Sequence, residues 1–429
     1  MAAVLACSIF VVTYAFIATE RIHRVTAALG GVAAMALVGV VDTQTAFYTS
    51  DSGIDWNVIF LLFGMMVIVG VLKQTGLFDY FAIWAAQRSR GRPFRLMVLL
   101  IVVTAGASAL LDNVTTVLLV APVTLTICKA LRLRAAPYLI VLAFASNIGG
   151  TATLIGDPPN IIIASRADLS FNDFLIHLTP IVVVLLAAFI GLCWLMFRHQ
   201  LQFNEAEARA VMDLRPTDAI TDGRVLVRCL AVLAAVMIGF SLHSTLHVQP
   251  SLIALLGARA IVLVSGTAPE RFLEEVEWAT LVFFMGLFIL VGGLVEVGVI
   301  DGLGQAAVDA TGGRYFLAAT GLLFGSAVLG AFVDNIPYTA TMAPIVEGLA
   351  NSAPDAESQA LWWAFALGAD LGGNTTAVAA AANVVVIGIA ARHRQPISFW
   401  EFTKYGLLVT TVTLLIAWPY VWGRYYAFN

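Results

Sequence analysis

The chain has 429 residues, of which 60% are apolar and only 12% are Asp, Glu, Lys or Arg. Soluble domains carry about 25% charged residues, so this composition excludes an ordinary soluble enzyme, a disordered chain and a secreted disulfide scaffold. The formal net charge of −4 gives no reason to expect a nucleic-acid partner. A multi-pass membrane protein remains, with the lipid bilayer as its solvent.

Apolar runs long enough to cross a bilayer recur along the whole chain. A hydrocarbon core of about 30 Å needs roughly 20 apolar residues per helix. Ten spans are predicted, at residues 3–19, 25–41, 56–75, 136–165, 173–198, 225–243, 250–266, 278–297, 360–391 and 400–424. Two further apolar segments, 94–130 and 315–346, carry a polar turn in their middle. Trp362, Trp363 and Trp400 are interpreted as anchors at the membrane interface.

Lys and Arg gather in alternate loops, which sets the expected orientation. Of the 23 basic residues, 19 fall in loops on one side, and the opposite loops hold only Arg166, Arg314 and Arg424. Basic loops stay in the cytoplasm, so both termini are expected on the other face of the cell membrane.

The sequence repeats itself at a shift of 222 residues. Trp56 then meets Trp278, and the pair Asp112-Asn113 meets Asp334-Asn335. The chain is therefore divided into a first repeat over 1–198, a cytoplasmic linker over 199–224 and a second repeat over 225–429. Each half carries five spans, and an odd number inverts the second half, as in many secondary transporters.

The two extra segments reverse direction at matching polar turns. The first turn carries Asp112, Asn113, Thr115 and Thr116, and the second carries Asp334, Asn335 and Thr339. Two alternatives are open: full spans joined by a surface turn, or re-entrant hairpins with their tips buried in protein. The turns lack a surrounding polar loop, which favours hairpins.

Two predicted spans are interrupted by Gly, Asn and Thr in their middle. Asp157 followed by Pro158 indicates that a helix restarts there, whereas Ala380 stands at the matching place in the second half. The candidate residues of the two breaks are Asn147, Gly149, Gly150, Thr151, Thr153 and Asp157, then Asp370, Gly372, Gly373, Asn374, Thr375 and Thr376. The predicted fold is an all-α polytopic membrane protein with two inverted repeats, about ten transmembrane helices, two re-entrant hairpins and two broken helices.

Four acids lie at membrane depth in this scheme: Asp112, Asp157, Asp334 and Asp370. An intramembrane carboxyl group is a candidate functional residue, and no Lys or Arg is predicted beside these four. Such a site suits a proton, a cation or a neutral hydroxylated solute better than a multiply charged anion. Each acid also has a structural interpretation: Asp157 as a helix cap, Asp112 and Asp334 as turn locks with the neighbouring Asn facing substrate, and Asp370 as a buried neutral acid.

The polar stretches resemble those of a known family. ASNIGGTATLIGDPPNI at 145–161, LDNVTTVLLVAP at 111–122, DNIPYTATMAP at 334–344 and GADLGGNTTAVAAAANVVV at 368–386 are similar to the ion transporter superfamily. Within it they resemble the citrate-transporter-like branch with the arsenite permeases of the ArsB type, the melanosomal P protein and the NhaD-type sodium/proton antiporters. This resemblance implies an elevator mechanism, with substrate and coupling ion bound at the hairpin tips and helix breaks. Relatives that carry dicarboxylates have Ser-Asn-Thr at the tips, where this chain has Asp-Asn-Val and Asp-Asn-Ile.

The leading hypothesis is a proton-coupled secondary transporter that exports arsenite or antimonite. A sodium/proton antiporter and an organic-anion carrier of the citrate type are the alternatives. The chain has no GxxxxGK[ST] loop, so ATP hydrolysis would need a separate soluble ATPase partner. A homodimer is also considered. No metal site, enzyme activity or cofactor is expected beyond the coupling ion, a proton or Na⁺.

Overall fold

The computed structural model describes residues 2–19, 21–49, 52–201, 215–266 and 268–427, and every regular element in these ranges is helical. The first half contains α1 (Ala2–Thr19), α2 (Arg24–Leu37), α3 (Thr43–Phe47), α4 (Trp56–Gln74), α5 (Leu77–Ser89), α6 (Pro93–Ser108), α7 (Asn113–Ala130), α8 (Ala135–Gly150), α9 (Pro158–Ala167), α10 (Phe171–His177) and α11 (Thr179–Phe197). The second half contains η1 (Pro216–Ala219), α13 (Gly223–Leu246), α14 (Pro250–Ser265), α15 (Pro269–Glu274), α16 (Trp278–Glu296), α17 (Val299–Thr311), α18 (Tyr315–Gly330), α19 (Asn335–Asn351), α20 (Asp355–Gly372), α21 (Ala381–Arg392) and α22 (Phe399–Tyr425).

Within the described residues, seven helices are long and apolar enough to cross a membrane: α1, α4, α7, α11, α13, α16 and α22. The predicted all-helical polytopic membrane fold is confirmed, although several of the ten predicted spans differ in length from the helices observed. The spans expected at 25–41 and 250–266 form α2 and α14, which have only 14 and 16 residues. Those expected at 136–165 and 360–391 are each divided in two, as the Gly-rich interruptions indicated.

Helix starts recur at the sequence offset of 222 residues. The helices α4 to α7 begin at residues 56, 77, 93 and 113, and α16 to α19 begin at 278, 299, 315 and 335. Gly76 and Gly298 adopt left-handed backbone angles, with φ of 78° and 71°, and separate the first two helices of each set. Only glycine adopts this conformation without strain. The boundaries at 198 and 224 stay a prediction, and residues 202–214 of the linker lie outside the described part.

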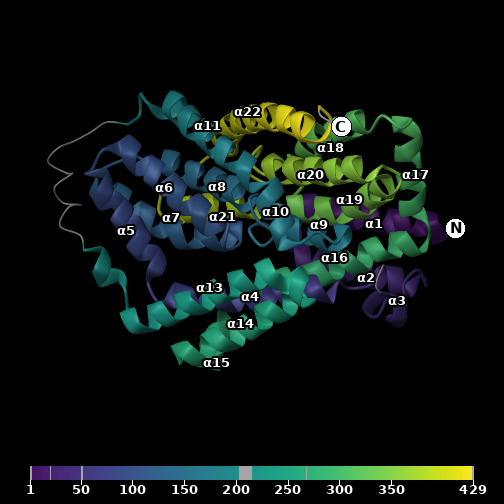
Figure 1. Cartoon of the computed structure of the whole chain (residues 1–429), viewed down its shortest axis with the longest axis horizontal. Helices are drawn as coiled ribbons and strands as arrows, with labels where there is room; N and C mark the ends of the chain where they lie inside the picture. The colour runs from purple at the N-terminus through teal and green to yellow at the C-terminus, as the bar shows by residue number, and fades with distance from the viewer. Residues whose placement is uncertain (1, 20, 50–51, 202–214, 267, 428–429) are drawn as a thin grey trace.

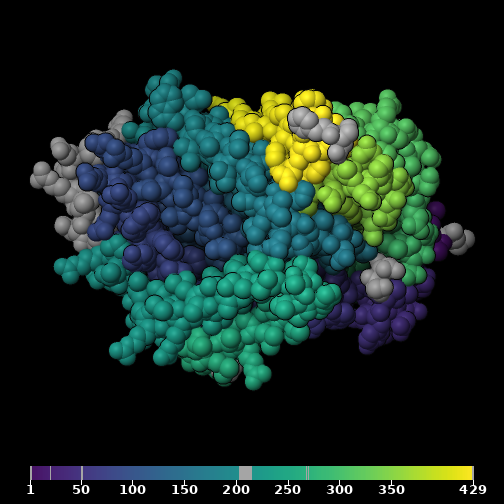
Figure 2. All heavy atoms as spheres, in the orientation of Figure 1, coloured from purple at the N-terminus to yellow at the C-terminus, as the bar shows by residue number. Residues whose placement is uncertain are grey.

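The helices form two groups that face each other (Figure 1). One group contains α4, α13, α14 and α15 along the lower edge of the view, where α13 and α14 make a band on the surface (Figure 2). The other contains both hairpin-like pairs, α6–α7 and α18–α19, around the divided helices.

Small residues allow close packing in two matching helix pairs, α4 with α14 and α16 with α2. Gly64 of α4 lies against Ala254 of α14, where an added Cβ would approach backbone within 2.7 Å, and Gly286 of α16 lies against Ala28 of α2 at 3.0 Å. Small residues at such crossings are typical of membrane helix pairs. The helices α4 and α16 run antiparallel, because Lys73 near the end of α4 binds Glu275 before α16 at 2.6 Å.

The interpretation of Trp362 and Trp363 as interfacial anchors is wrong. Their exposed fractions are 5% and 1%, because α20 lies inside the protein. The Trp363 ring stacks on His177 of α10 with centroids 4.8 Å apart. Trp400, in contrast, is 76% exposed.

Candidate functional site

Each divided helix is held open by an asparagine that binds the carbonyl groups of the break. Asn160 Nδ2 donates to the carbonyl oxygens of Gly150 and Thr153, at 3.4 and 3.0 Å. Asn383 Nδ2 donates to those of Gly373 and Thr376, at 2.7 and 2.9 Å. Both asparagines are fully buried. They satisfy backbone acceptors that the interrupted helices leave free, which is required where water is scarce.

The hairpin-like pairs dock on these breaks through the same bond in both halves. Thr153 Oγ1 donates to the carbonyl oxygen of Ala109 at 2.5 Å, and Thr376 Oγ1 donates to that of Ala331 at 2.6 Å. The backbone N–H of Asn335 also donates to the carbonyl of Ala379 at 3.1 Å. The tips and the breaks therefore form one continuous polar structure inside apolar surroundings.

Asp112 and Asp334 act as helix caps at the two tips. Asp112 Oδ1 accepts from the Thr115 N–H at 2.8 Å, and its other oxygen accepts from Thr115 Oγ1 at 2.5 Å. Asp334 Oδ1 accepts from the Ile336 N–H at 3.1 Å. A carboxylate at this position satisfies a free N–H and stabilises the positive end of the helix dipole. The structural interpretation of these two acids is thus supported.

The asparagine that follows each capping acid points into the protein. Asn113 is 3% exposed, and its Nδ2 donates to Asn147 Oδ1 at 3.1 Å and to Asp157 Oδ2 at 2.8 Å. Asn147 Nδ2 in turn donates to Asn374 Oδ1 at 3.0 Å and to Asn383 Oδ1 at 3.3 Å. This chain of amides joins hairpin α6–α7 to both breaks.

Asp157 stands at the N-cap position of α9, but its side chain makes no capping bond. Its role is instead in the amide chain, so the interpretation as a simple cap is wrong. Asp157 lies beside Asn335, and Asp370 lies beside Thr151 and Asn160. Both carboxyl groups have no exposed surface.

These two acids leave several acceptors without a donor. Asp157 Oδ1, both oxygens of Asp370 and Asn160 Oδ1 are buried and accept no hydrogen bond from any described residue. An ionised carboxylate without donors is costly to bury, so this centre calls for protons or a cation. It can therefore exchange a proton or bind a solute that donates hydrogen bonds.

The other predicted residues divide between the tips and the packing of the breaks. Thr116 and Thr339 are buried with unpartnered hydroxyl groups, and Thr375 Oγ1 donates to Thr410 Oγ1 of α22 at 3.2 Å. Gly149 and Gly372 are close-approach positions, since an added Cβ would lie 2.4 Å from the Ala105 carbonyl oxygen and 2.7 Å from Ala327 Cα. Gly150 and Gly373 are similarly constrained by Gly156 and Asp370.

The prediction that no cation lies near the four acids is wrong at one tip. Arg24 Nη1 lies 3.8 Å from Asp334 Oδ2. Nothing in the sequence links the two, because they are 310 positions apart. Asn160 and Asn383 are further site residues that the sequence does not single out, although they lie 223 positions apart and match across the two breaks.

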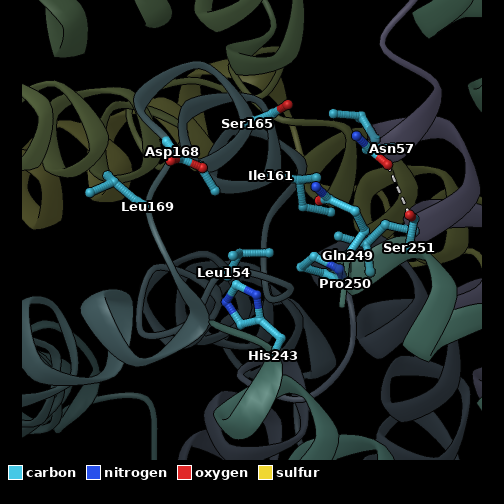
Figure 3. A pocket seen from close by; sticks show the side chains of 13 residues that line it. Asn57, Leu154, Ile161, Ser165, Asp168, Leu169, His243, Gln249, Pro250 and Ser251 are labelled. Atoms are coloured by element: carbon cyan, nitrogen blue, oxygen red, sulfur yellow. Dashed lines mark hydrogen bonds between the residues drawn. The ribbon is translucent and has the colours of Figure 1, made fainter. Parts of the chain in front are cut away.

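A polar cavity of about 170 Å³ lies beside the first break, between α9 and the helices α4, α13 and α14. Figure 3 shows His243, Asp168 and Ser165 around its open space. Asn57 and Ser251 close one side, with Ser251 Oγ donating to Asn57 Oδ1 at 3.0 Å. Leu154 and Ile161 connect its wall to the break. Among the described residues, no group of three or more His, Cys, Asp or Glu could hold a metal ion.

Comparison with known proteins identifies the family. The model of the family CitMHS, described as a citrate transporter, matches residues 14–368. The chain belongs to this family. The family consists of transporters, which agrees with the helical fold described above. The protein is therefore a multi-pass membrane transporter and not an enzyme.

Several relatives match over almost the whole chain. A transporter of Mycobacterium tuberculosis is 52% identical over 99% of both chains, and a 46 kDa membrane protein of Mycobacterium leprae is 49% identical over 98% of this chain and 99% of its own. The human P protein is 32% identical over 97% of this chain, which spans 59% of that protein. The crystal structure of the YdaH transporter of Alcanivorax borkumensis shares the fold, with a TM-score of 0.56 at 18% identity, covering 85% of this chain and 84% of YdaH.

Proposed function

We propose that this protein is a proton-coupled secondary transporter that exports arsenite or antimonite. The observation that carries the proposal is the group of buried acceptor oxygens on Asp157, Asp370 and Asn160, which accept no hydrogen bond among the described residues although Asn335 and Thr151 lie beside the two acids. Arsenite at neutral pH is an uncharged trihydroxide, and its three O–H groups are donors. Such a solute complements an acceptor-rich centre, whereas an acceptor-rich anion does not.

The two carboxyl groups supply the coupling in this proposal. Asp157 and Asp370 come from opposite halves and are close enough to interact electrostatically. Two neighbouring buried carboxyl groups do not ionise together easily, so at least one keeps its proton while the site is empty. In this proposal, the binding or release of the solute changes this proton's affinity and so couples the two. The amide chain from Asn113 to Asn374 then orients the solute without adding charge.

The second candidate is sodium/proton antiport. Carboxylate and amide oxygens are the ligands that hard cations prefer, and Asp157, Asp370 and Asn160 offer four of them within one buried region. Citrate transport, which the family description names, has less support at this site. Among the described residues of the site, the unpartnered buried donors for a tricarboxylate are neutral: the amides of Asn335 and Asn374 and the hydroxyl groups of Thr116 and Thr339.

Movement between the two faces is proposed to follow the elevator scheme. The hairpin pairs and divided helices would move as one body, because Thr153 and Thr376 bind each break to its own hairpin. The helices α4 and α16, joined by the Lys73–Glu275 ion pair, would stay as part of the scaffold. Inverted repeats support such a movement because the same packing can form on either face.

The test is a flux measurement in vesicles that contain the purified protein. Arsenite, sodium and citrate are each measured with and without an imposed pH gradient. We expect arsenite flux that follows the gradient and that Asp370→Asn abolishes, while Asp355→Asn, at the exposed start of α20, leaves it unchanged. Arsenite flux that ignores the gradient contradicts proton coupling, and sodium flux without arsenite flux supports the second candidate.

A further inference from the structure

Arg24 lies between α16 and the tip of the α18–α19 hairpin. Its Nη2 donates to Thr280 Oγ1 at 3.1 Å, and its guanidinium carbon is 5.3 Å from the centroid of the Phe283 ring. Its Nη1 lies 3.8 Å from Asp334 Oδ2, with exposed side-chain fractions of 31% for Arg24 and 22% for Asp334. The guanidinium is thus oriented by α16 and presents its remaining N–H groups to the hairpin tip.

An acid, Glu277, lies in the same region. Thr280 Oγ1 donates to Glu277 Oε2 at 3.0 Å, and Glu277 interacts electrostatically with Arg24 and with Asp112. Arg24, Glu277 and Thr280 therefore form one small cluster where α2 and α16 begin, and this cluster contacts the α18–α19 tip through Asp334. We refer to these three residues as the α16 cluster.

The opposite face has no equivalent of this cluster. Asp55 is the counterpart of Glu277 at the offset of 222, but it caps α4 through the N–H groups of Asn57 and Val58 and contacts Ser165 of α9. The helices α2 and α14 begin at residues 24 and 250, so they are related by an offset of 226, and the position equivalent to Arg24 is Pro250, which carries no charge. The repeat therefore places a cation at Arg24 and none at its counterpart in the second half.

We propose that Arg24 is a positioning residue that holds the α18–α19 tip at the α16 cluster, and that its ion pair with Asp334 selects the state in which the site lies at this face. This inference rests on the proposed elevator movement. When the hairpins move, the Arg24–Asp334 pair must separate, because the orientation of Arg24 is fixed by Thr280 and Phe283 on the scaffold. The absence of a cation at the matching position makes the two end states unequal in energy.

The experiment measures the distance between the tip and the scaffold without any transported solute. Spin labels are placed at Phe332→Cys beside the tip and Trp278→Cys at the start of α16, two exposed positions outside the candidate site. All four native cysteines are first replaced by alanine. Pulsed electron-spin resonance in lipid nanodiscs then gives the ratio of short to long distances. A partly buried ion pair has an expected effect of about tenfold on this ratio.

We expect Arg24→Gln to lower the short-distance fraction by about that factor, and Asp334→Asn to lower it equally. Asn at position 334 keeps the capping oxygen, so a folding defect is not expected. The double variant should match either single variant, because both remove the same pair. Arg21→Gln, which removes an exposed charge from the same loop, should leave the ratio unchanged.

Three outcomes overturn the inference: an unchanged ratio in Arg24→Gln, additive effects in the double variant, or an equal effect of Arg21→Gln. Failure of the proposed function looks different. If transport assays and distances indicate no movement in any protein, including Asp334→Asn, the elevator scheme itself is wrong. If wild type shows two distances while no arsenite, sodium or proton flux is found, the substrate proposal fails and the role of Arg24 stands.

Discussion

At the residue scale, both buried acids, Asp157 and Asp370, are expected to be needed for proton-driven flux. Neither oxygen of Asp370 accepts a hydrogen bond among the described residues, and Thr151 and Asn160 lie beside it, so an amide at 370 resembles the neutral, protonated carboxyl group. Asp370→Asn should fold normally and lose proton-driven flux while it still binds solute. Asp157 accepts from Asn113. Asp157→Asn should also lose flux, and a variant that keeps gradient-driven transport would contradict the assignment.

The asparagines that hold the breaks are expected to be structural. Asn160→Ala removes the donor to the carbonyl groups of Gly150 and Thr153 and leaves these acceptors buried. Each such loss costs about 1–3 kcal/mol, so the thermal unfolding temperature in detergent should fall clearly. Asn383→Ala should behave alike because it makes the same two bonds in the second half. Asn351→Ala, at an exposed helix end, is the control, and equal melting of all three variants would disprove the role.

At the scale of the elements, close helix crossings determine where the breaks lie. Gly149 of α8 meets the backbone of Ala105 in α6, and an added methyl group would lie 2.4 Å from its carbonyl oxygen. Gly149→Ala should destabilise the protein by about 1–3 kcal/mol through overpacking. Gly106→Ala, on the same α6 helix, meets nothing within 4 Å and should be neutral or slightly stabilising. Folded yield from size-exclusion chromatography compares them, and equal yields would contradict the packing argument.

Helix α10 is expected to give a pH-dependent contribution to stability. Burial lowers the pKa of His177, helped by the charge of Arg424 and opposed by Asp173. The unfolded chain therefore binds a proton more readily, and its His pKa is about 6.5. Stability should be full above that pH and decline as the pH falls below it. His177→Phe keeps a ring between Trp363 and Tyr425 and should flatten unfolding temperatures measured from pH 8 to pH 5.5. The same profile in His177→Phe, or an equal change in the exposed control His199→Gln, would reject the assignment.

At the scale of the whole molecule, the features that can be predicted from the sequence are those in which the same polar residues recur in both repeats. Asp112-Asn113, Asp334-Asn335 and the two breaks are recognisable because polar residues interrupt apolar runs in one register. Arg24 is not, since its contact depends on how far the α18–α19 tip reaches past α16. The burial of Trp363 likewise depends on α10 and α22 covering α20. A helix that is covered by protein on both sides is apolar all round, so its sequence has no hydrophobic periodicity that would distinguish it from a helix facing lipid.

The proposed division into a moving body and a scaffold predicts that one cross-link stops transport and another does not. Asp55 at the start of α4 contacts Ser165 of α9, across the boundary between the two bodies. A short dithiol-reactive linker between Asp55→Cys and Ser165→Cys should fix the present arrangement and abolish flux, and a reducible linker should restore it on reduction. Ser52 and Glu296, bonded at 2.6 Å, both belong to the scaffold around α16. Linking Ser52→Cys to Glu296→Cys should therefore leave flux unchanged, because no relative movement occurs there. If both linked proteins transport equally well, the two bodies do not move past each other at α9, and the boundary has to be placed elsewhere.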